Sequence, residues 1–205
     1  MRLCNLIWDF DGTLLDTYPH STTAFFEIMR PYGFNEDFET VMAQLHRSFN
    51  SVRTLYNLSD AQFDAFLEHA YDLWFEPVPT VYPGAREVLS AVCAAGGNNF
   101  LYTHRNKTAI DYLEAFDLLP FFRACVTNEQ PEFDYKPAGT VVRRLVEQYQ
   151  LDPAQTAMIG DREMDVLAGQ AGGCRGILFD PLRQSDKTAA DQIIGALSEL
   201  LPLLS

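Results

Sequence analysis

The chain has 205 residues, more than the commonest single domain but fewer than two full-sized domains. We therefore expect one core domain that carries a smaller inserted module. A hydrophobic fraction of 47% and an aromatic fraction of 13% are sufficient for a packed core and exclude a disordered chain. A formal net charge of -13 disfavours nucleic acids and anionic membranes as partners, because both attract basic surfaces. An anionic substrate would need a local cation to receive it.

The cysteines and the N-terminal segment give no sign of export. The apolar run before Asp9 is too short for a signal peptide, and no segment offers about 18 uninterrupted apolar residues for a membrane span. The four cysteines lack the spacing of a metal site, so we interpret them as buried, reduced thiols. We expect a soluble, cytoplasmic protein. The cysteines are Cys4, Cys93, Cys125 and Cys174.

The first part of the chain predicts one strand followed by a helical insert. Residues 3–8 form an apolar run that ends in acids and Gly12, which is typical of a buried parallel strand meeting a loop. Residues 17–76 show apolar residues at helical spacing and predict three to four helices. Ser59 is the predicted N-cap of the last one. The proline-rich residues 76–84 predict the returning linker.

The remainder alternates between strand and helix patterns, which predicts an α/β fold with a doubly wound, Rossmann-like parallel sheet. The core would comprise residues 1–16 and 77–205, and the inserted helical cap residues 17–76. The predicted strands are 99–103, 124–127, 156–159 and 175–179. The predicted helices are 85–95, 107–116, 137–149, 164–171 and, as a closing amphipathic helix, 189–201.

Polar residues follow the predicted strands at four places. Ligands of doubly wound sheets bind beyond the carboxyl ends of the strands, so these four groups would converge on one edge. Each group alone has an ordinary structural interpretation as a turn, a strand end or a helix start. The four groups are Asp9 to Thr13, Thr103 to Arg105, Lys136-Pro137, and Gly160-Asp161 with Asp165.

The order and spacing of these motifs resemble those of the haloacid dehalogenase-like hydrolase superfamily. The matching segments are WDFDGTLLDT, then Thr103 after a strand, then KP at residue 136, then GDREMD from residue 160. The resemblance covers nearly the whole chain and is greatest to the phosphoglycolate phosphatase-like branch, which inserts a helical cap after the first motif. It implies a Rossmann-like core, Mg²⁺ as cofactor and an aspartyl-phosphate intermediate.

The first motif predicts a nucleophile and an acid/base partner. Asp9 would attack phosphorus in line with the leaving oxygen, and water would hydrolyse the acyl phosphate. Asp11 would protonate the leaving oxygen and later accept a proton from the attacking water. The resemblance also implies phosphoryl chemistry, because dehalogenases of the superfamily lack an acid at the position of Asp11.

A phosphate dianion repels a carboxylate nucleophile unless a cation bridges them, and Mg²⁺ prefers oxygen ligands. As the resemblance implies, Asp9 and Asp161 would supply carboxylates and Asp11 its backbone carbonyl. Asp165 would complete the metal site by orienting Lys136 or a metal-bound water.

The phosphate oxygens need donors of their own. We expect the Thr103 hydroxyl, the Lys136 ammonium and backbone N–H groups near Gly12 and His104 to bind them. His104 stands where relatives often have Asn, so it would line the pocket or cap the loop.

Four arginines have open roles. Arg105 and Arg162 would contact substrate or serve the structure, with Arg162 pairing with Asp165 on the helix surface. In the insert, Arg47, or failing it Arg53, would bind a distal anionic group of the substrate; the alternative is a solvated helix arginine.

These observations predict a Mg²⁺-dependent phosphatase for a small phosphorylated metabolite. Phosphoglycolate, a sugar phosphate, a nucleotide and a pyrophosphate all fit as substrates, and the chain fits a monomer or a homodimer. The alternatives are a phosphohexose mutase of the same fold and, from another class, a non-catalytic phosphoacceptor or binding module.

Overall fold

The computed structural model describes residues 2–183 and 188–204. The chain divides into two compact units, Leu15–Thr80 and the remainder, Met1–Leu14 with Val81–Ser205. We call the first the helical unit and the second the sheet unit. Among the residues that the structure describes, no helix combines the length and apolar character needed to cross a bilayer.

The sheet unit contains a six-stranded sheet in the order β5-β4-β1-β6-β7-β8, in which every neighbouring pair is parallel. This confirms the predicted α/β, doubly wound fold. Strand β1 is central, and all four of its residues are buried, as the apolar run predicts. The strands are β1 Asn5–Trp8, β4 Asn98–Tyr102, β5 Phe122–Val126, β6 Thr156–Gly160, β7 Arg175–Phe179 and β8 Gln192–Ile194.

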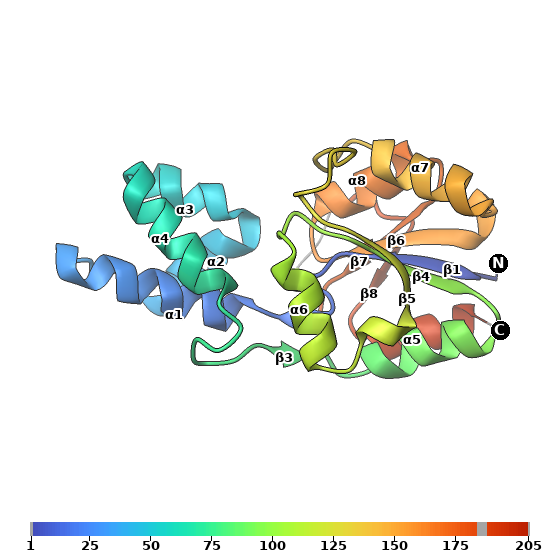
Figure 1. Ribbon diagram of the computed structural model, residues 1–205, viewed down its shortest axis with the longest axis horizontal. Helices are drawn as coiled ribbons and strands as arrows, with labels where there is room; N and C mark the ends of the chain where they lie inside the picture. Colours follow the sequence, from blue (N-terminus) through green and yellow to red (C-terminus); the bar gives the residue numbers. More distant parts are fainter. Residues whose placement is uncertain (1, 184–187, 205) are drawn as a thin grey trace. The chain divides into compact units, whose positions relative to one another are not determined.

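Helices cover both faces of this sheet. Figure 1 shows α7 and α8 on one side and α5 on the other. Ile7, Phe100 and Met158 of three neighbouring strands share one buried core cluster with Val141 and Leu145 of α7. The helices are α5 Ala85–Ala94, α6 Thr108–Ala115, α7 Thr140–Tyr149 and α8 Glu163–Ala171, with 3-10 helices η2 Leu119–Phe121, η3 Pro153–Gln155 and η4 Leu197–Leu203.

The helical unit has a core of its own, in which Phe25 and Phe66 pack edge to face with ring centroids 5.6 Å apart. Ser59 caps α4, and Gln62 completes a capping box with it, which confirms the predicted N-cap. The short strands β2 Leu15–Asp16 and β3 Thr80–Val81 pair with each other. The helices are α1 Tyr18–Met29, η1 Arg30–Tyr32, α2 Phe38–Arg47, α3 Phe49–Leu55 and α4 Asp60–Tyr71.

The predicted closing helix over residues 189–201 is wrong. The chain instead forms strand β8, which extends the sheet by pairing Ile194 with Phe179, and then the 3-10 helix η4. Ile194, Leu197 and Leu200 are all buried and lie three residues apart, a spacing that a 3-10 helix shares with an α-helix. The sheet captures the first of these positions, and Pro202 inside η4 disfavours an α-helix over the rest.

The cysteines only partly match the expectation of buried thiols. All four are free, and Cys174 is buried, but Cys93 is exposed on α5. The prediction is wrong for Cys93, because that side of α5 faces solvent.

Candidate active site

Neighbouring strands β4, β1 and β6 bring three of the four sequence motifs to one edge of the sheet. The hydrogen-bond ladder continues beyond the strands, since the Asp9 N–H donates to the Ile159 carbonyl and the Thr103 N–H donates to that of Val126. Lys136, from the loop between β5 and α7, reaches the same edge. The convergence predicted from strand order therefore holds for the sheet unit.

The centre of this edge is a buried ionic triad. Lys136 Nζ lies 2.6 Å from Asp9 Oδ1 and 2.6 Å from Asp165 Oδ1. The three residues are only 3%, 1% and 0% exposed, so each charge depends on the others for compensation. Burial opposes the charge on Lys136, but Asp165 and Asp9 outweigh it and raise the pKa of the ammonium. Lys136 therefore stays cationic between two acids.

Burial raises the pKa of Asp9 to about 6, although the Lys136 charge acts in the opposite direction. Asp9 is thus ionised near neutral pH. Its second oxygen, Oδ2, is buried and accepts no hydrogen bond from any residue that the structure describes. Arg162 Nη2 lies 3.9 Å from that oxygen. A buried carboxylate oxygen of this kind is a ready ligand for a metal ion.

Three acids at this edge fit a divalent cation. Asp9, Asp161 and Asp165 each offer a carboxylate oxygen, and these oxygens all lie within 4.8 Å of one another. An all-oxygen set of acids matches the preference of Mg²⁺. Gly160 makes room for the cluster, because a Cβ there would come within 2.2 Å of Asp165 Cγ.

Asp165 and Asp11 differ in the basic groups that their carboxylates contact. Asp165 Oδ1 forms an ion pair with Lys136, and Oδ2 accepts the Arg162 N–H at 3.1 Å. This suits the predicted orienting role. The Asp11 side chain contacts Arg105 and does not belong to the acidic cluster. The expected metal contact through the Asp11 backbone carbonyl stays a prediction.

The donors predicted for phosphate oxygens lie in the adjoining loops. Thr103 Oγ1 accepts the Arg105 N–H at 3.0 Å, which leaves the hydroxyl hydrogen for another acceptor. Gly12 has a φ of 74°, a left-handed conformation that glycine adopts without strain, and it turns the chain directly after Asp11.

His104 links two of the motif loops. Its Nε2 accepts the Lys136 backbone N–H at 3.0 Å, and its ring packs edge to face against Phe133 and Tyr135. Burial, followed by the Lys136 charge, lowers the pKa of His104 to about 3, so the ring is neutral with its proton on Nδ1. The side chain supports Lys136, a role that the sequence left open.

Arg105 and Arg162 contact different acids. Arg105 contacts Asp11 with its guanidinium, a contact that the sequence did not predict. Arg162 turns toward the acids, with Nε 3.9 Å from Asp161 Oδ1, and meets Asp165 only through its backbone N–H. The expected side-chain pair of Arg162 with Asp165 is therefore wrong, because the two nearer acids attract the guanidinium.

The two arginines singled out in the insert belong to the helical unit. Arg47 is exposed at the end of α2, whereas Arg53 forms an ion pair with Asp60 at 2.5 Å and lies 5.0 Å from the centre of the Phe63 ring. Arg53 is thus already paired with residues of the helical unit.

A doubly wound sheet with an acidic cluster and a lysine at its carboxyl edge is an enzyme-type site. The sequence model of the family described as haloacid dehalogenase-like hydrolase matches residues 6–179. The chain belongs to this family, which confirms the resemblance predicted from the motifs.

Similar proteins cover nearly the same length. The phosphoglycolate phosphatase of Vibrio vulnificus (strain YJ016) is 26% identical over 221 residues, which cover 97% of this chain and 95% of the relative. Pyrophosphatase PpaX of Bacillus mycoides (strain KBAB4) is 23% identical over 215 residues, covering 100% and 98%. The crystal structure of a hydrolase from Streptococcus pneumoniae TIGR4 is 31% identical, has a TM-score of 0.67 and covers 88% of this chain and 94% of that one.

Proposed function

We propose that this chain is a Mg²⁺-dependent phosphatase that hydrolyses a small phosphate ester through a phosphorylated Asp9. The observation that carries the proposal is the buried cluster in which Lys136 compensates Asp9 while three carboxylate oxygens lie within 4.8 Å. Such a cluster offers a nucleophile, a cation for phosphate oxygens and ligands for a metal. The names of the relatives support the same class of reaction.

The proposed steps use the side chains that meet at this edge of the sheet. Asp9 attacks phosphorus, and the bond to the leaving oxygen breaks while Asp11 protonates that oxygen. Lys136 and the Thr103 hydroxyl bind equatorial oxygens, where negative charge develops in the transition state. Water then attacks the acyl phosphate, Asp11 accepts its proton, and phosphate leaves with Asp9 restored.

Asp9 and Asp161, with the Asp11 carbonyl, would hold Mg²⁺, and Asp165 would steady the group by orienting Lys136. Bound there, Mg²⁺ would offset the repulsion between the Asp9 carboxylate and the phosphate dianion. The residues need this help, because a carboxylate nucleophile and a phosphate are both anions.

The helical unit would act as a cap that selects the substrate. Its exposed Arg47 is a candidate for a distal anionic group, such as the carboxylate of phosphoglycolate or the second phosphate of pyrophosphate. Both substrates follow from the names of relatives, and a sugar phosphate or a nucleotide also fits the proposed chemistry.

The test is phosphate release from phosphoglycolate, pyrophosphate, sugar phosphates and nucleotides, with Mg²⁺ and with EDTA. We expect Mg²⁺-dependent release from at least one compound, abolished by Asp9→Asn. Asp111→Asn removes an exposed acid of the same unit and serves as the matched control. Activity of Asp9→Asn near that of the control would contradict the nucleophile, and bisphosphate-activated isomerisation without release would favour a mutase.

A further inference from the structure

We propose that Arg105 is a positioning residue that fixes the orientation of the Asp11 carboxylate for proton transfer. The inference rests on the proposed acid/base function of Asp11 and extends it to a residue that the mechanism above does not use. It predicts that Arg105 acts on catalysis only through Asp11.

Two guanidinium donors of Arg105 converge on Oδ1 of Asp11, and one of them also reaches Oδ2. Arg105 Nη2 donates to Asp11 Oδ1 at 2.7 Å, and Nε lies 3.1 Å from Oδ1 and 3.3 Å from Oδ2. Two donors held in one rigid plane restrict the position of Oδ1, and the longer contact to Oδ2 restricts the rotation of the carboxylate, more than a single lysine ammonium would. The contact therefore sets the side-chain torsions of Asp11 as well as its charge environment.

The arginine itself has little freedom to move. Its side chain is fully buried, and its guanidinium carbon lies 5.5 Å from the centre of the Phe10 ring and 5.4 Å from that of Tyr112. Aromatic faces stabilise a cation at such distances. Its backbone is held too, since the Arg105 N–H donates to Thr103 Oγ1 and its carbonyl accepts the Asn128 N–H at 3.1 Å.

Asp11, by contrast, is in part accessible, since its side chain is 15% exposed while that of Arg105 is 0% exposed. Arg105 therefore lies inside the protein, whereas Asp11 lies at the surface of the site. Phe10 connects them further, because it separates Asp9 from Asp11 in sequence and packs under the guanidinium. A small displacement of an acid/base group lowers the rate steeply, so an anchor of this kind affects turnover.

A merely structural role makes a different prediction. If Arg105 only compensated a charge in the core, its loss would lower the amount of folded enzyme and depress all substrates alike. If it positions Asp11, its loss matters most where the leaving oxygen needs a proton. The ratio of kcat for a poor and a good leaving group separates the two, because it is independent of the folded fraction of a sample.

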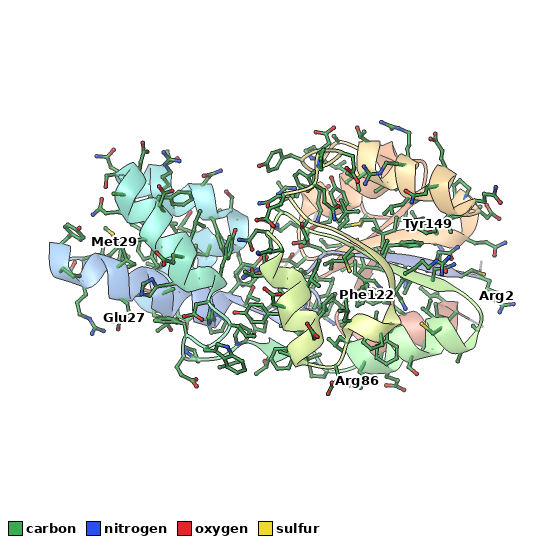
Figure 2. The ribbon with its side chains drawn as sticks, viewed as in Figure 1. Arg2, Glu27, Met29, Arg86, Phe122 and Tyr149 are labelled. Carbon is green, nitrogen blue, oxygen red and sulfur yellow. The ribbon has the colours of Figure 1, made fainter. Side chains whose placement is uncertain are left out.

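The experiment measures kcat and KM with Mg²⁺ for phenyl phosphate and p-nitrophenyl phosphate. The variants are Arg105→Lys, Asp11→Asn and the double variant, with Arg86→Lys as control; Arg86 lies on α5 and is labelled in Figure 2. We expect Arg105→Lys to lower kcat for phenyl phosphate about 10-fold or more, though less than the roughly 10²–10⁴-fold that the whole proton transfer contributes, and to lower it less for p-nitrophenyl phosphate. KM should stay the same, and Arg105→Lys should cause no further loss in the Asp11→Asn background.

Two results would contradict the inference, and they show which step of it fails. If Asp11→Asn changes the kcat ratio but Arg105→Lys lowers both substrates equally, or adds its full effect to Asp11→Asn, only the positioning role fails. If Asp11→Asn leaves the ratio unchanged, the acid/base role of Asp11 fails and the inference fails with it. Should Arg105→Lys fold poorly, the ratio from its folded fraction still decides between these outcomes.

Discussion

Replacing Lys136 by Met tests the buried ionic triad. Met is apolar and of similar length, so the change removes the cation with little change in packing. It leaves the Asp9 and Asp165 carboxylates together at 1% and 0% exposure without the charge that lies 2.6 Å from each. The perturbation therefore isolates the electrostatic contribution of one residue.

Removing one partner of a buried ion pair costs about 3–5 kcal/mol, because the remaining charge is uncompensated. In a chain of this length each kcal/mol lowers Tm by about 2–4 °C, so we expect Lys136→Met to melt about 6–20 °C below wild type in EDTA. Lys107→Met, an exposed lysine of the same unit, should stay within about 0.5 kcal/mol of wild type.

The stability lost in Lys136→Met should depend on pH. Burial already raises the pKa of Asp9, and without the opposing charge of Lys136 it rises further above the unfolded value. A group whose folded pKa is raised contributes stability at low pH that is lost as pH rises through the folded pKa. The stability deficit of Lys136→Met should thus be larger at pH 7.5 than at pH 5.5.

Urea unfolding in EDTA at the two pH values measures this deficit. Lys136→Met/Asp165→Asn should recover part of it, since one buried charge is gone and the Asn carbonyl can still accept the Arg162 N–H. A Lys136→Met variant as stable as the Lys107 control at both pH values would refute the triad as a charge-compensated unit.

Three further predictions concern neighbouring positions. Burial lowers the pKa of His104 to about 3, so below pH 6.5 the unfolded chain binds a proton that the folded chain does not. The free energy of unfolding of wild type should therefore fall by up to about 1.4 kcal/mol per pH unit. His104→Gln should lack this contribution when urea unfolding is compared at pH 6.5 and 5.5. Gly160→Ala should lower stability by about 1–3 kcal/mol in a thermal melt, since its Cβ would come within 2.2 Å of Asp165 Cγ; an unchanged Tm would contradict the close contact. Arg47→Ala should lower kcat/KM about tenfold on the best substrate and leave Tm unchanged, and an unaffected kcat/KM would exclude contact with a distal anion.

The sequence predicts most of the site because its residues depend on strand order. Asp9, Thr103 and Asp161 follow buried apolar runs, and parallel strands place their carboxyl ends at one edge. Lys136 was predicted from its place before a helix, although α7 begins only at Thr140. For such residues the prediction depended on strand order together with the motif order shared with the family, because each motif alone also fits an ordinary turn, strand end or helix start.

The contact between Arg105 and Asp11 could not be read from the sequence. It depends on the two rings of Phe10 and Tyr112, which come from the loop after β1 and from α6 and have no common periodicity. The contact from the Lys136 N–H to His104 depends on tertiary packing in the same way. The error over residues 189–201 has a related cause, because the pairing of β8 with β7 overrides a spacing that fits a helix.

The charges of the site bear on how a chain of net charge -13 would receive the phosphate that the proposed function requires. With all groups ionised, four acids at this edge face three basic side chains, and the set carries one net negative charge. The set is neutral once Asp11 holds the proton that it donates in the proposed mechanism, so neither state attracts an anion. A divalent cation held by the acids would change the net charge of the set from negative to positive. Electrostatic attraction of substrate therefore depends on metal binding, and substrate affinity should fall with the metal as well as the rate of turnover. The acids are Asp9, Asp11, Asp161 and Asp165, and the basic residues are Arg105, Lys136 and Arg162.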